Sequence, residues 1–185
     1  STVVIDGKVL GNTQYFAEVI AAYAGADMYR IEPEIPYTED HDALVDQAQK
    51  EQAEGARPTI QGGIPDLTQY DTVFVGYPNW WADLPMILYT FFDTADLSGK
   101  TVIPFDTNGG SGLSDTVSTI RGLEPAADVK DGLGISRDDI QDAKGQIETW
   151  VSGLGFRQVS LTDAEKNATV KQSSADTAAE VQLTL

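Results

Sequence analysis

Helix-like and strand-like hydrophobic patterns alternate along the chain, with turn residues between them. Continuous β-branched and aromatic runs at residues 71–78 and 100–107 are typical of strands covered on both faces. Weaker strands are predicted at 28–32 and 129–135. Apolar residues recur at helical spacing in residues 13–24, 39–54, 85–92, 113–122 and 138–153. This alternation predicts an α/β fold, a doubly wound parallel sheet between two helical layers.

The two ends of the chain depart from this alternation. Residues 4–10, VIDGKVL, are typical of a small hairpin with its turn at Asp6-Gly7. From residue 157 the composition shifts toward Ala, Thr, Ser, Gln and Asp, which predicts an extended or partly ordered tail over 157–185. The closing EVQLTL could form an edge strand. We therefore expect one domain over residues 1–156, followed by this tail.

Composition limits the chemistry. A chain of 185 residues with 41% hydrophobic content can bury one core, and no apolar run approaches the ~18 residues of a membrane-spanning helix. There is no cysteine, and His41 is the single histidine. Disulfides and a Cys nucleophile are excluded, no metal site is predicted, and His41 is expected at the surface. Redox chemistry would therefore need a bound organic cofactor.

The chain is strongly acidic. Twenty-nine acidic and 12 basic side chains give a formal charge of −17 and a pI near 4.1. A field of this sign repels nucleic acid and anionic membranes and favours basic partners, although acidity that only maintains solubility explains it equally well. The sequence starts at Ser1 rather than Met, which indicates a processed, trimmed or omitted N-terminus. We expect a cytoplasmic protein, and the sequence leaves export open.

A first candidate loop, GNTQ at residues 11–14, lies directly before the first helix. Gly11 allows close approach of the backbone, while Asn12 and Thr13 offer side-chain donors. The helix start adds unpaired N–H groups and a partial positive charge, so the loop could cradle a phosphate without Lys or Arg. Ordinary helix capping by the same residues is the alternative.

A second loop, GYPNWWADLP at residues 76–85, contains two adjacent tryptophans. Large aromatic side chains in a turn-rich loop either pack down or stack on something flat. Adjacent side chains point in different directions. We therefore expect one of Trp80 and Trp81 to fill the core and the other to face a ligand.

A third loop, TNGGSG at residues 107–112, follows the next buried strand. Its glycines allow backbone N–H groups to approach a ligand, and Asn108 and Ser111 add hydrogen-bonding groups, although Gly-rich turns are common. Ligands of open α/β sheets bind beyond the carboxyl ends of the strands. Convergence of the three loops at that edge is more specific than any one of them.

These segments, together with YRIEPEIPYTEDHDALVDQAQKEQ and DGLGI…AKGQIETWVSGLG, resemble the flavodoxin family, in particular its short bacterial flavoproteins with a Trp-Trp loop. The resemblance covers residues 11–156 and implies a flavodoxin-like three-layer α/β/α fold that binds FMN. It implies that Gly11, Asn12, Thr13 and Gln14 hold the phosphate. Pro78, Asn79, Trp80 and Trp81 would flank the ribityl chain and ring, and Thr107, Asn108, Gly109, Gly110 and Ser111 would line the ring's polar edge.

The start of the chain departs from the family pattern, in which a buried first strand runs into the phosphate loop. Here the first strand is either shortened to residues 2–5 or missing, and the hairpin pattern favours a missing strand. A missing strand would leave a slot in the sheet for another chain or for the C-terminal EVQLTL. Asp106 and Asn108 also stand where relatives often have other residues.

Two redox functions fit these observations, and the sequence names no catalytic residue for either. The first is an FMN-binding electron-transfer protein that docks a basic redox partner, with a low potential for the fully reduced couple because the three loops lack Lys and Arg. The alternative is an NAD(P)H-dependent reductase of quinones or flavins, which needs room for a small planar electron acceptor. A non-redox module that binds another phosphorylated ligand, or nothing, is a third hypothesis. The oligomeric state is left open.

Overall fold

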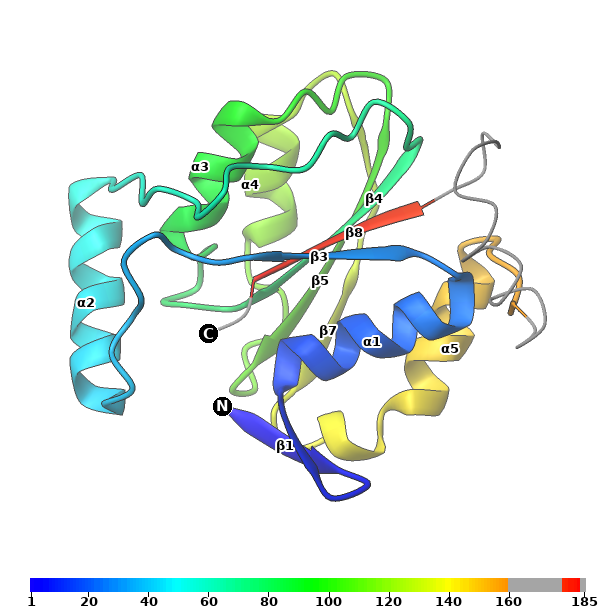
Figure 1. Ribbon diagram of the computed structural model, residues 1–185, viewed down its shortest axis with the longest axis horizontal. Helices are drawn as coiled ribbons and strands as arrows, with labels where there is room; N and C mark the ends of the chain where they lie inside the picture. Colours follow the sequence, from blue (N-terminus) through cyan, green and yellow to red (C-terminus); the bar gives the residue numbers. More distant parts are fainter. Residues whose placement is uncertain (160–177, 184–185) are drawn as a thin grey trace.

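The computed structural model describes residues 1–159 and 178–183, which form an α/β fold (Figure 1). The described helices are α1 (Asn12–Ala24), α2 (His41–Glu54), α3 (Met86–Thr94), α4 (Thr116–Leu123) and α5 (Lys144–Gly153), with a 3-10 turn, η1 (Ile140–Asp142), before α5. The strands are β1 (Thr2–Ile5), β2 (Lys8–Gly11), β3 (Asp27–Ile31), β4 (Thr72–Pro78), β5 (Thr101–Asn108), β6 (Asp128–Val129), β7 (Leu133–Ser136) and β8 (Ala178–Leu183).

Within the described residues, six strands form one sheet in the order β3-β8-β4-β5-β6, and β7 also pairs with β5. Every pairing in this sheet is parallel. Because all of these strands run in one direction, the loops that follow them meet at one edge. The doubly wound parallel sheet predicted from the sequence is confirmed.

Two predicted elements are each divided in the structure. The expected strand at 129–135 is two short strands, β6 and β7, because Gly132 between them takes a left-handed conformation with φ of 77°. The expected helix at 138–153 begins as η1, where the Ala143 N–H bonds to the Ile140 carbonyl, three residues back, before α5 starts. Both strands still pair with β5, so the sheet keeps its order.

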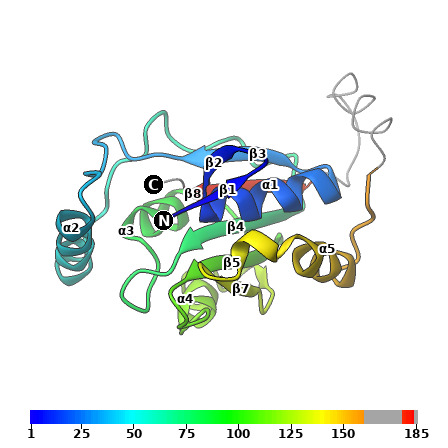
Figure 2. The same cartoon turned by 90° about the horizontal axis from the view of Figure 1, so that it is seen from below.

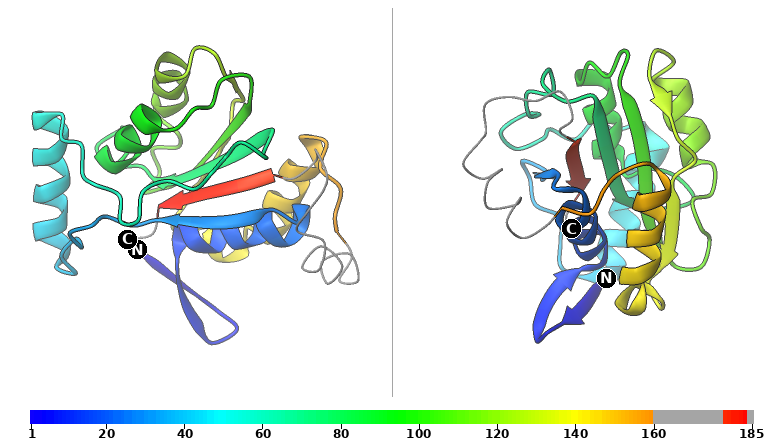
Figure 3. Two further views of the ribbon diagram at one scale, coloured as in Figure 1. Left: turned by 45° about the horizontal axis from the view of Figure 1, so that its top comes forward. Right: turned by 90° about the vertical axis from the view of Figure 1, so that its right-hand side faces the viewer.

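Strand β8 lies in the interior of the sheet, between β3 and β4 (Figures 1 and 3). Val181 of β8 is in register with Tyr29 on one side and with Val75 on the other. The expectation that this segment forms an edge strand is therefore wrong. Of the two occupants considered for a slot in the sheet, another chain or this segment, the structure places this segment inside the sheet. The division into a domain at 1–156 and a tail at 157–185 stays a prediction.

The N-terminal segment forms a separate two-stranded hairpin. β1 and β2 pair antiparallel, with the turn at Asp6 and Gly7, as the sequence predicts. Figure 3 shows the hairpin projecting from the start of α1. Residues 2–5 thus do not act as a shortened first strand of the main sheet.

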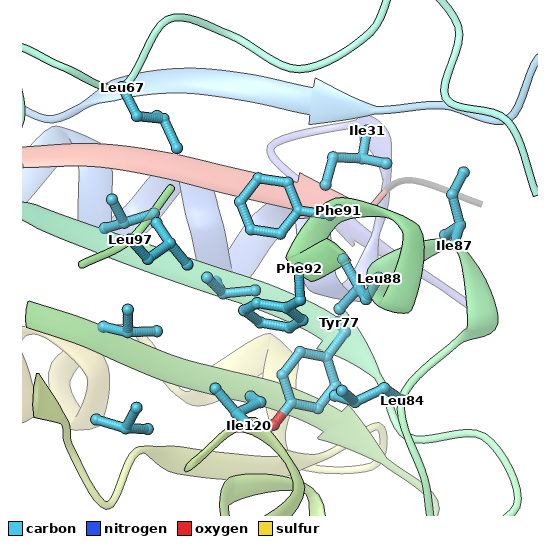
Figure 4. Close-up of a cluster of buried hydrophobic side chains, with 14 of the residues drawn as sticks. Ile31, Leu67, Tyr77, Leu84, Ile87, Leu88, Phe91, Phe92, Leu97 and Ile120 are labelled. Carbon is cyan, nitrogen blue, oxygen red and sulfur yellow. The ribbon is translucent and has the colours of Figure 1, made fainter. Parts of the chain in front are cut away.

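Two hydrophobic layers cover the sheet (Figure 2). α1 and α5 pack on one face, where Phe16 contacts Phe105 with ring centroids 4.6 Å apart. α3 and α4 pack on the other face through the cluster in Figure 4, which includes Tyr77, Phe91 and Ile120. α2 contributes to neither cluster and stands at the side of the molecule (Figure 1).

Among the described residues, no helix combines the length and the apolar character that crossing a bilayer requires.

Substitution of Val181 by proline is expected to destabilise the fold by about 1–3 kcal/mol, because proline removes a ladder donor from an interior strand and leaves the facing acceptor unpaired. Val181→Thr is the matched control, since threonine keeps the N–H and the β-branched shape. Urea unfolding followed by tryptophan fluorescence measures both. Equal midpoints for the two variants would show that β8 is not an interior strand.

Candidate functional site

A cavity of about 890 Å³ opens at the carboxyl edge of the sheet. Its walls come from the start of α1, the segment after β3, one face of α2, the loop after β4, the end of β5 and Arg137 after β7. The volume is near the upper end of the range of small-molecule sites, about 300–1,000 Å³. The three loops singled out in the sequence all contribute to it.

The start of α1 forms the first wall. Gly11 is the N-cap, and Asn12 and Thr13 are buried although both are polar. The first turn contains no acidic residue, so nothing there opposes an anion at the positive end of the helix dipole. The Thr13 and Thr107 hydroxyls are 2.7 Å apart and share one hydrogen bond, which joins this loop to the end of β5. The geometry suits a compact anionic group.

Asn12 supports the same conclusion. Its Nδ2 donates to the Ser1 hydroxyl at 3.0 Å, while its buried Oδ1 has no hydrogen-bond partner among the described residues. A hydroxyl both donates and accepts, so the amide can turn over: Oδ1 then accepts from Ser1, and Nδ2 is left to donate. In that orientation Asn12 offers a donor to a phosphate oxygen and no buried atom stays unpaired.

The tryptophan pair lies in a strained turn. Trp80 and Asp83 exchange two backbone hydrogen bonds of 3.0 Å, and the two residues between them, Trp81 and Ala82, have φ of 53° and 60°. Such turns normally use Asn, Asp or Gly at both central positions, because other residues lose about 1–2 kcal/mol there. Strain of this kind is concentrated at functional sites.

Neither tryptophan enters the core. Trp80 is half-buried and packs edge-on against Tyr37, with centroids 5.6 Å apart, and Trp81 is 49% exposed. Both line the cavity. The expectation that one of them fills the core is wrong, because the turn carries both rings past the end of β4. The Trp81 indole N–H donates to the Val45 carbonyl at 3.3 Å, which connects the turn to α2.

Two asparagines brace the other loops. The Asn79 N–H donates to the Thr107 carbonyl at 2.9 Å, and its side-chain Nδ2 donates to the Gly112 carbonyl at 2.8 Å. The Asn108 side chain accepts from the Gly110 N–H at 2.9 Å. These contacts hold the loops after β4 and β5 together without a ligand, so the site is preorganised.

The structure brings together most of the residues predicted for the site. Those that line the cavity are Gly11, Asn12, Thr13, Gln14, Pro78, Asn79, Trp80, Trp81, Thr107, Asn108 and Gly109. Gly110 and Ser111 are not among its lining residues, because the loop after β5 turns away at that point. What each of the thirteen binds stays a prediction.

Sequence reasoning missed two walls, the segment after β3 and α2, and three charged residues of the cavity, Glu32, Glu39 and Arg137. The helix predicted at 39–54 is confirmed as α2, and its apolar residues Leu44, Val45 and Ala48 line the cavity instead of joining either hydrophobic cluster. An amphipathic pattern shows that a helix has an apolar face and not what covers it. Arg137, just after β7, also reaches the cavity, and its position two residues after the strand predicted at 129–135 was the available signal. His41 lies at the rim and is exposed.

A buried acid lies beneath this edge. Asp106 near the end of β5 is fully buried, and burial raises its pKa to about 7, against the opposing effect of the Asn108 hydrogen bond and of the nearby Asn79 amide. Its Oδ2 has no hydrogen-bond partner among the described residues. Asp106 therefore changes charge close to neutral pH.

Comparisons with known proteins agree with this architecture. The family model described as flavodoxin matches residues 3–154. A crystal structure from Bacteroides eggerthii DSM 20697, described as a candidate flavoprotein, is 31% identical, with 80% of this chain and 93% of that chain covered and a TM-score of 0.69. No match to the chain is found among curated proteins.

Two further solved structures share the fold. A candidate flavoprotein from Bacteroides uniformis ATCC 8492 is 27% identical, covering 77% of this chain and 91% of that chain, with a TM-score of 0.69. A flavoprotein from Lactobacillus acidophilus NCFM, solved in complex with FMN, is 25% identical, covering 72% of this chain and 90% of that chain, with a TM-score of 0.56.

The buried acid has a testable effect on stability. The pKa of Asp106 is raised in the folded state, so ionisation in the unfolded chain makes the native protein lose stability as pH rises from about 4 to about 7. Asp106→Asn removes that loss. Across this window we expect the free energy of unfolding of the variant to rise relative to that of the native protein by at most about 1.4 kcal/mol per pH unit. Above about pH 7 the difference should stay constant.

Urea unfolding at several pH values measures the difference between the two proteins. Burial and the neighbouring Asp96 and Asp93 also raise the pKa of Glu124. Because Glu124 is present in both proteins, its contribution to the pH dependence cancels in the difference. The control is Asp115→Asn, which neutralises an exposed acid at the start of α4, after the loop that follows β5. A difference that does not change with pH would contradict the buried-acid interpretation.

Proposed function

The chain belongs to the flavodoxin family, and from this premise we propose that it is an electron-transfer protein that binds FMN without a covalent bond. The observation that carries the proposal is the single cavity that joins the neutral helix start of α1 to the Trp80–Trp81 turn. One end offers donors and a helix dipole to a phosphate, and the other offers flat aromatic surface to a ring. The FMN complex of the Lactobacillus acidophilus relative supports the choice of cofactor.

Residues of this chain have distinct tasks in the proposed site. The side chains of Asn12 and Thr13 hold the phosphate, as the turned amide of Asn12 allows, together with the α1 N–H groups that follow Asn12. The Asn12 backbone N–H itself donates to the Ser1 carbonyl at 3.2 Å. Trp80 and Trp81 exclude water from the ring, and the loop after β5 offers backbone groups to its polar edge. FMN, when bound, supplies the electron chemistry. The protein orients it and sets the charge around it.

The charge of the protein indicates what it docks. A formal charge of −17 favours a basic protein partner, with fast and salt-sensitive association. Of the described residues that line the cavity, Arg137 has the one permanent positive charge, and its side chain is 59% exposed. The neutral loops predict a low reduction potential for the fully reduced couple. A cation as exposed as Arg137 raises that potential only weakly, because solvent screens its charge.

A second function, an NAD(P)H-dependent reductase of quinones or flavins, is favoured by one observation. Leu44, Val45 and Ala48 of α2 line the cavity opposite the sheet instead of packing on the core. An apolar wall across an opening of about 890 Å³ suits a small planar electron acceptor beside the cofactor. The electron-transfer proposal does not need this wall.

The phosphate end is tested by Asn12→Asp, which changes an amide into a carboxylate of the same shape. We expect FMN affinity to fall at least about tenfold, because two like charges about 4 Å apart repel by about 4 kcal/mol at an effective dielectric of about 20. The affinity for riboflavin, which lacks the phosphate, should fall much less. Calorimetric titration of both ligands measures the contrast.

The control for this charge is Gln146→Glu, on the exposed side of α5. Equal losses for FMN and riboflavin in Asn12→Asp would place the phosphate elsewhere. Absence of any FMN binding by the unchanged protein would leave the non-redox module as the better hypothesis.

The two redox functions are separated by stopped-flow reduction of the FMN-loaded protein. For an electron carrier we expect slow reduction by NADPH or NADH alone and fast reduction when a basic flavoprotein reductase is added. The fast phase should slow as salt rises from about 0.1 M to about 1 M, since the Debye length falls from about 10 Å to about 3 Å. Fast direct reduction, followed by fast oxidation with a naphthoquinone, would establish the reductase instead. In that case Leu44→Trp should slow the oxidation by the naphthoquinone and leave the FMN affinity unchanged.

A further inference from the structure

Asp106 is a buried acid that neither proposed function uses. It lies near the carboxyl end of β5, one residue before Thr107, and is fully buried. Its Oδ1 accepts a hydrogen bond from Asn108 Nδ2 at 2.9 Å, and its Oδ2 has no partner among the described residues. A buried carboxyl with one unpaired oxygen is costly, and its presence beneath a binding loop calls for a functional explanation.

Asn108 connects this carboxyl to the loop after β5. Its Nδ2 faces Asp106, which turns its Oδ1 toward the loop, where it accepts from the Gly110 N–H at 2.9 Å. The Asn108 carbonyl accepts from the Arg137 N–H at 2.8 Å, which fixes the backbone on the opposite side. The side chain of Asn108 lines the cavity rim and the acid lies behind it. A change at Asp106 therefore reaches Gly110 through a single side chain.

Strand β7 is shaped around this pair. Gly134 is in register with Asp106, and a Cβ at Gly134 would lie 2.6 Å from Asp106 Oδ1 and 3.3 Å from Asn108 Nδ2. It would also lie 3.2 Å from the Leu113 nitrogen. Any larger residue at position 134 would displace the carboxyl or the amide. The space for the Asp106–Asn108 pair is thus part of the sheet.

In the part of the chain that the structure describes, Asp106 has no cationic partner. On the β4 side, Asp106 faces Tyr77, whose hydroxyl donates to Thr116. The charged group nearby in the loop after β4 is Asp83, which is also an acid. Asp115 at the start of α4 is exposed, and the exposed Arg137 guanidinium lies 4.0 Å from Asp138. Burial without an opposite charge favours the neutral carboxyl. The pKa of about 7 agrees with this geometry.

We propose that Asp106 is a positioning residue that takes up a proton when the cavity above it is filled, and that it acts on the Gly110 end of the loop through Asn108. The inference rests on the proposed function, because FMN is the ligand that fills the cavity. Filling removes water from this edge and brings in a phosphate dianion, and both effects disfavour a second negative charge. The proton comes from solvent, and Asp106 changes from carboxylate to carboxylic acid.

The proton uptake is measured by calorimetry in buffers of different ionisation enthalpy, at pH 6, 7, 8 and 9. FMN and riboflavin are both titrated, because riboflavin has no phosphate whose own titration would contribute. We expect the protein to take up a fraction of a proton with both ligands near pH 7–8. The affinity should fall toward pH 9 by about tenfold for each unit by which binding raises the pKa of Asp106.

Asp106→Asn should abolish the riboflavin-linked uptake and flatten the pH profile of the affinity, whereas Asp115→Asn should behave as the unchanged protein. If Asp106→Asn does not fold, Asn108→Ala replaces it. Loss of the Asn108 hydrogen bond should raise the pKa of Asp106 in the free protein, and NMR of the carboxyl carbon measures this pKa. The proton uptake linked to flavin binding should then move to higher pH.

The outcomes separate the inference from the function on which it rests. Tight flavin binding without riboflavin-linked uptake at any pH overturns the role of Asp106 and leaves the FMN proposal standing. Uptake that persists in Asp106→Asn assigns the proton to another group and also overturns it. Failure of both flavins to bind overturns the proposed function, and the inference with it.

Discussion

The common direction of the strands is the constraint on which the site depends. β3, β4, β5 and β7 are linked only by parallel pairings, directly or through β8, so the segments that follow them gather at one edge. Without β8, β3 would have no partner in the sheet. Parallel strands also need helices to return the chain, which puts the start of α1 at that same edge. The cavity follows from this arrangement more than from any single side chain.

Much of this arrangement was predictable because it depends on local signals. The runs at 71–78 and 100–107 are too apolar to be half-exposed, so they predict buried parallel strands, and their following loops had to converge. The hairpin turn at Asp6-Gly7 is equally local. The place of β8 was less accessible, because EVQLTL alternates as an edge strand does. Only the departure from the family pattern, in which a buried first strand runs into the phosphate loop, indicated an interior position.

The site itself was predictable in its members and not in its details. The positive φ of Trp81 and Ala82 contradicts their residue types, so local propensity could not have foreseen a turn that holds both rings away from the core. The apolar face of α2 was recognised, but a periodic pattern carries no information on which surface covers it. The burial of Asp106 depends on Gly134, 28 positions later in the chain, and such a contact exists only after the sheet has formed.

Polar groups at this edge are mostly paired with one another, and the exceptions are informative. Among the described residues, Asn12 Oδ1 and Asp106 Oδ2 are the buried side-chain atoms that lack a partner. One belongs to the neutral helix start and the other lies behind the loop after β5, and these two elements meet at the hydrogen bond between Thr13 and Thr107. In a protein of charge −17, long-range forces oppose a phosphate. In the proposed function, short-range, directed donors at the α1 start would offset that repulsion, together with the exposed Arg137 and against the cavity-lining Glu32 and Glu39.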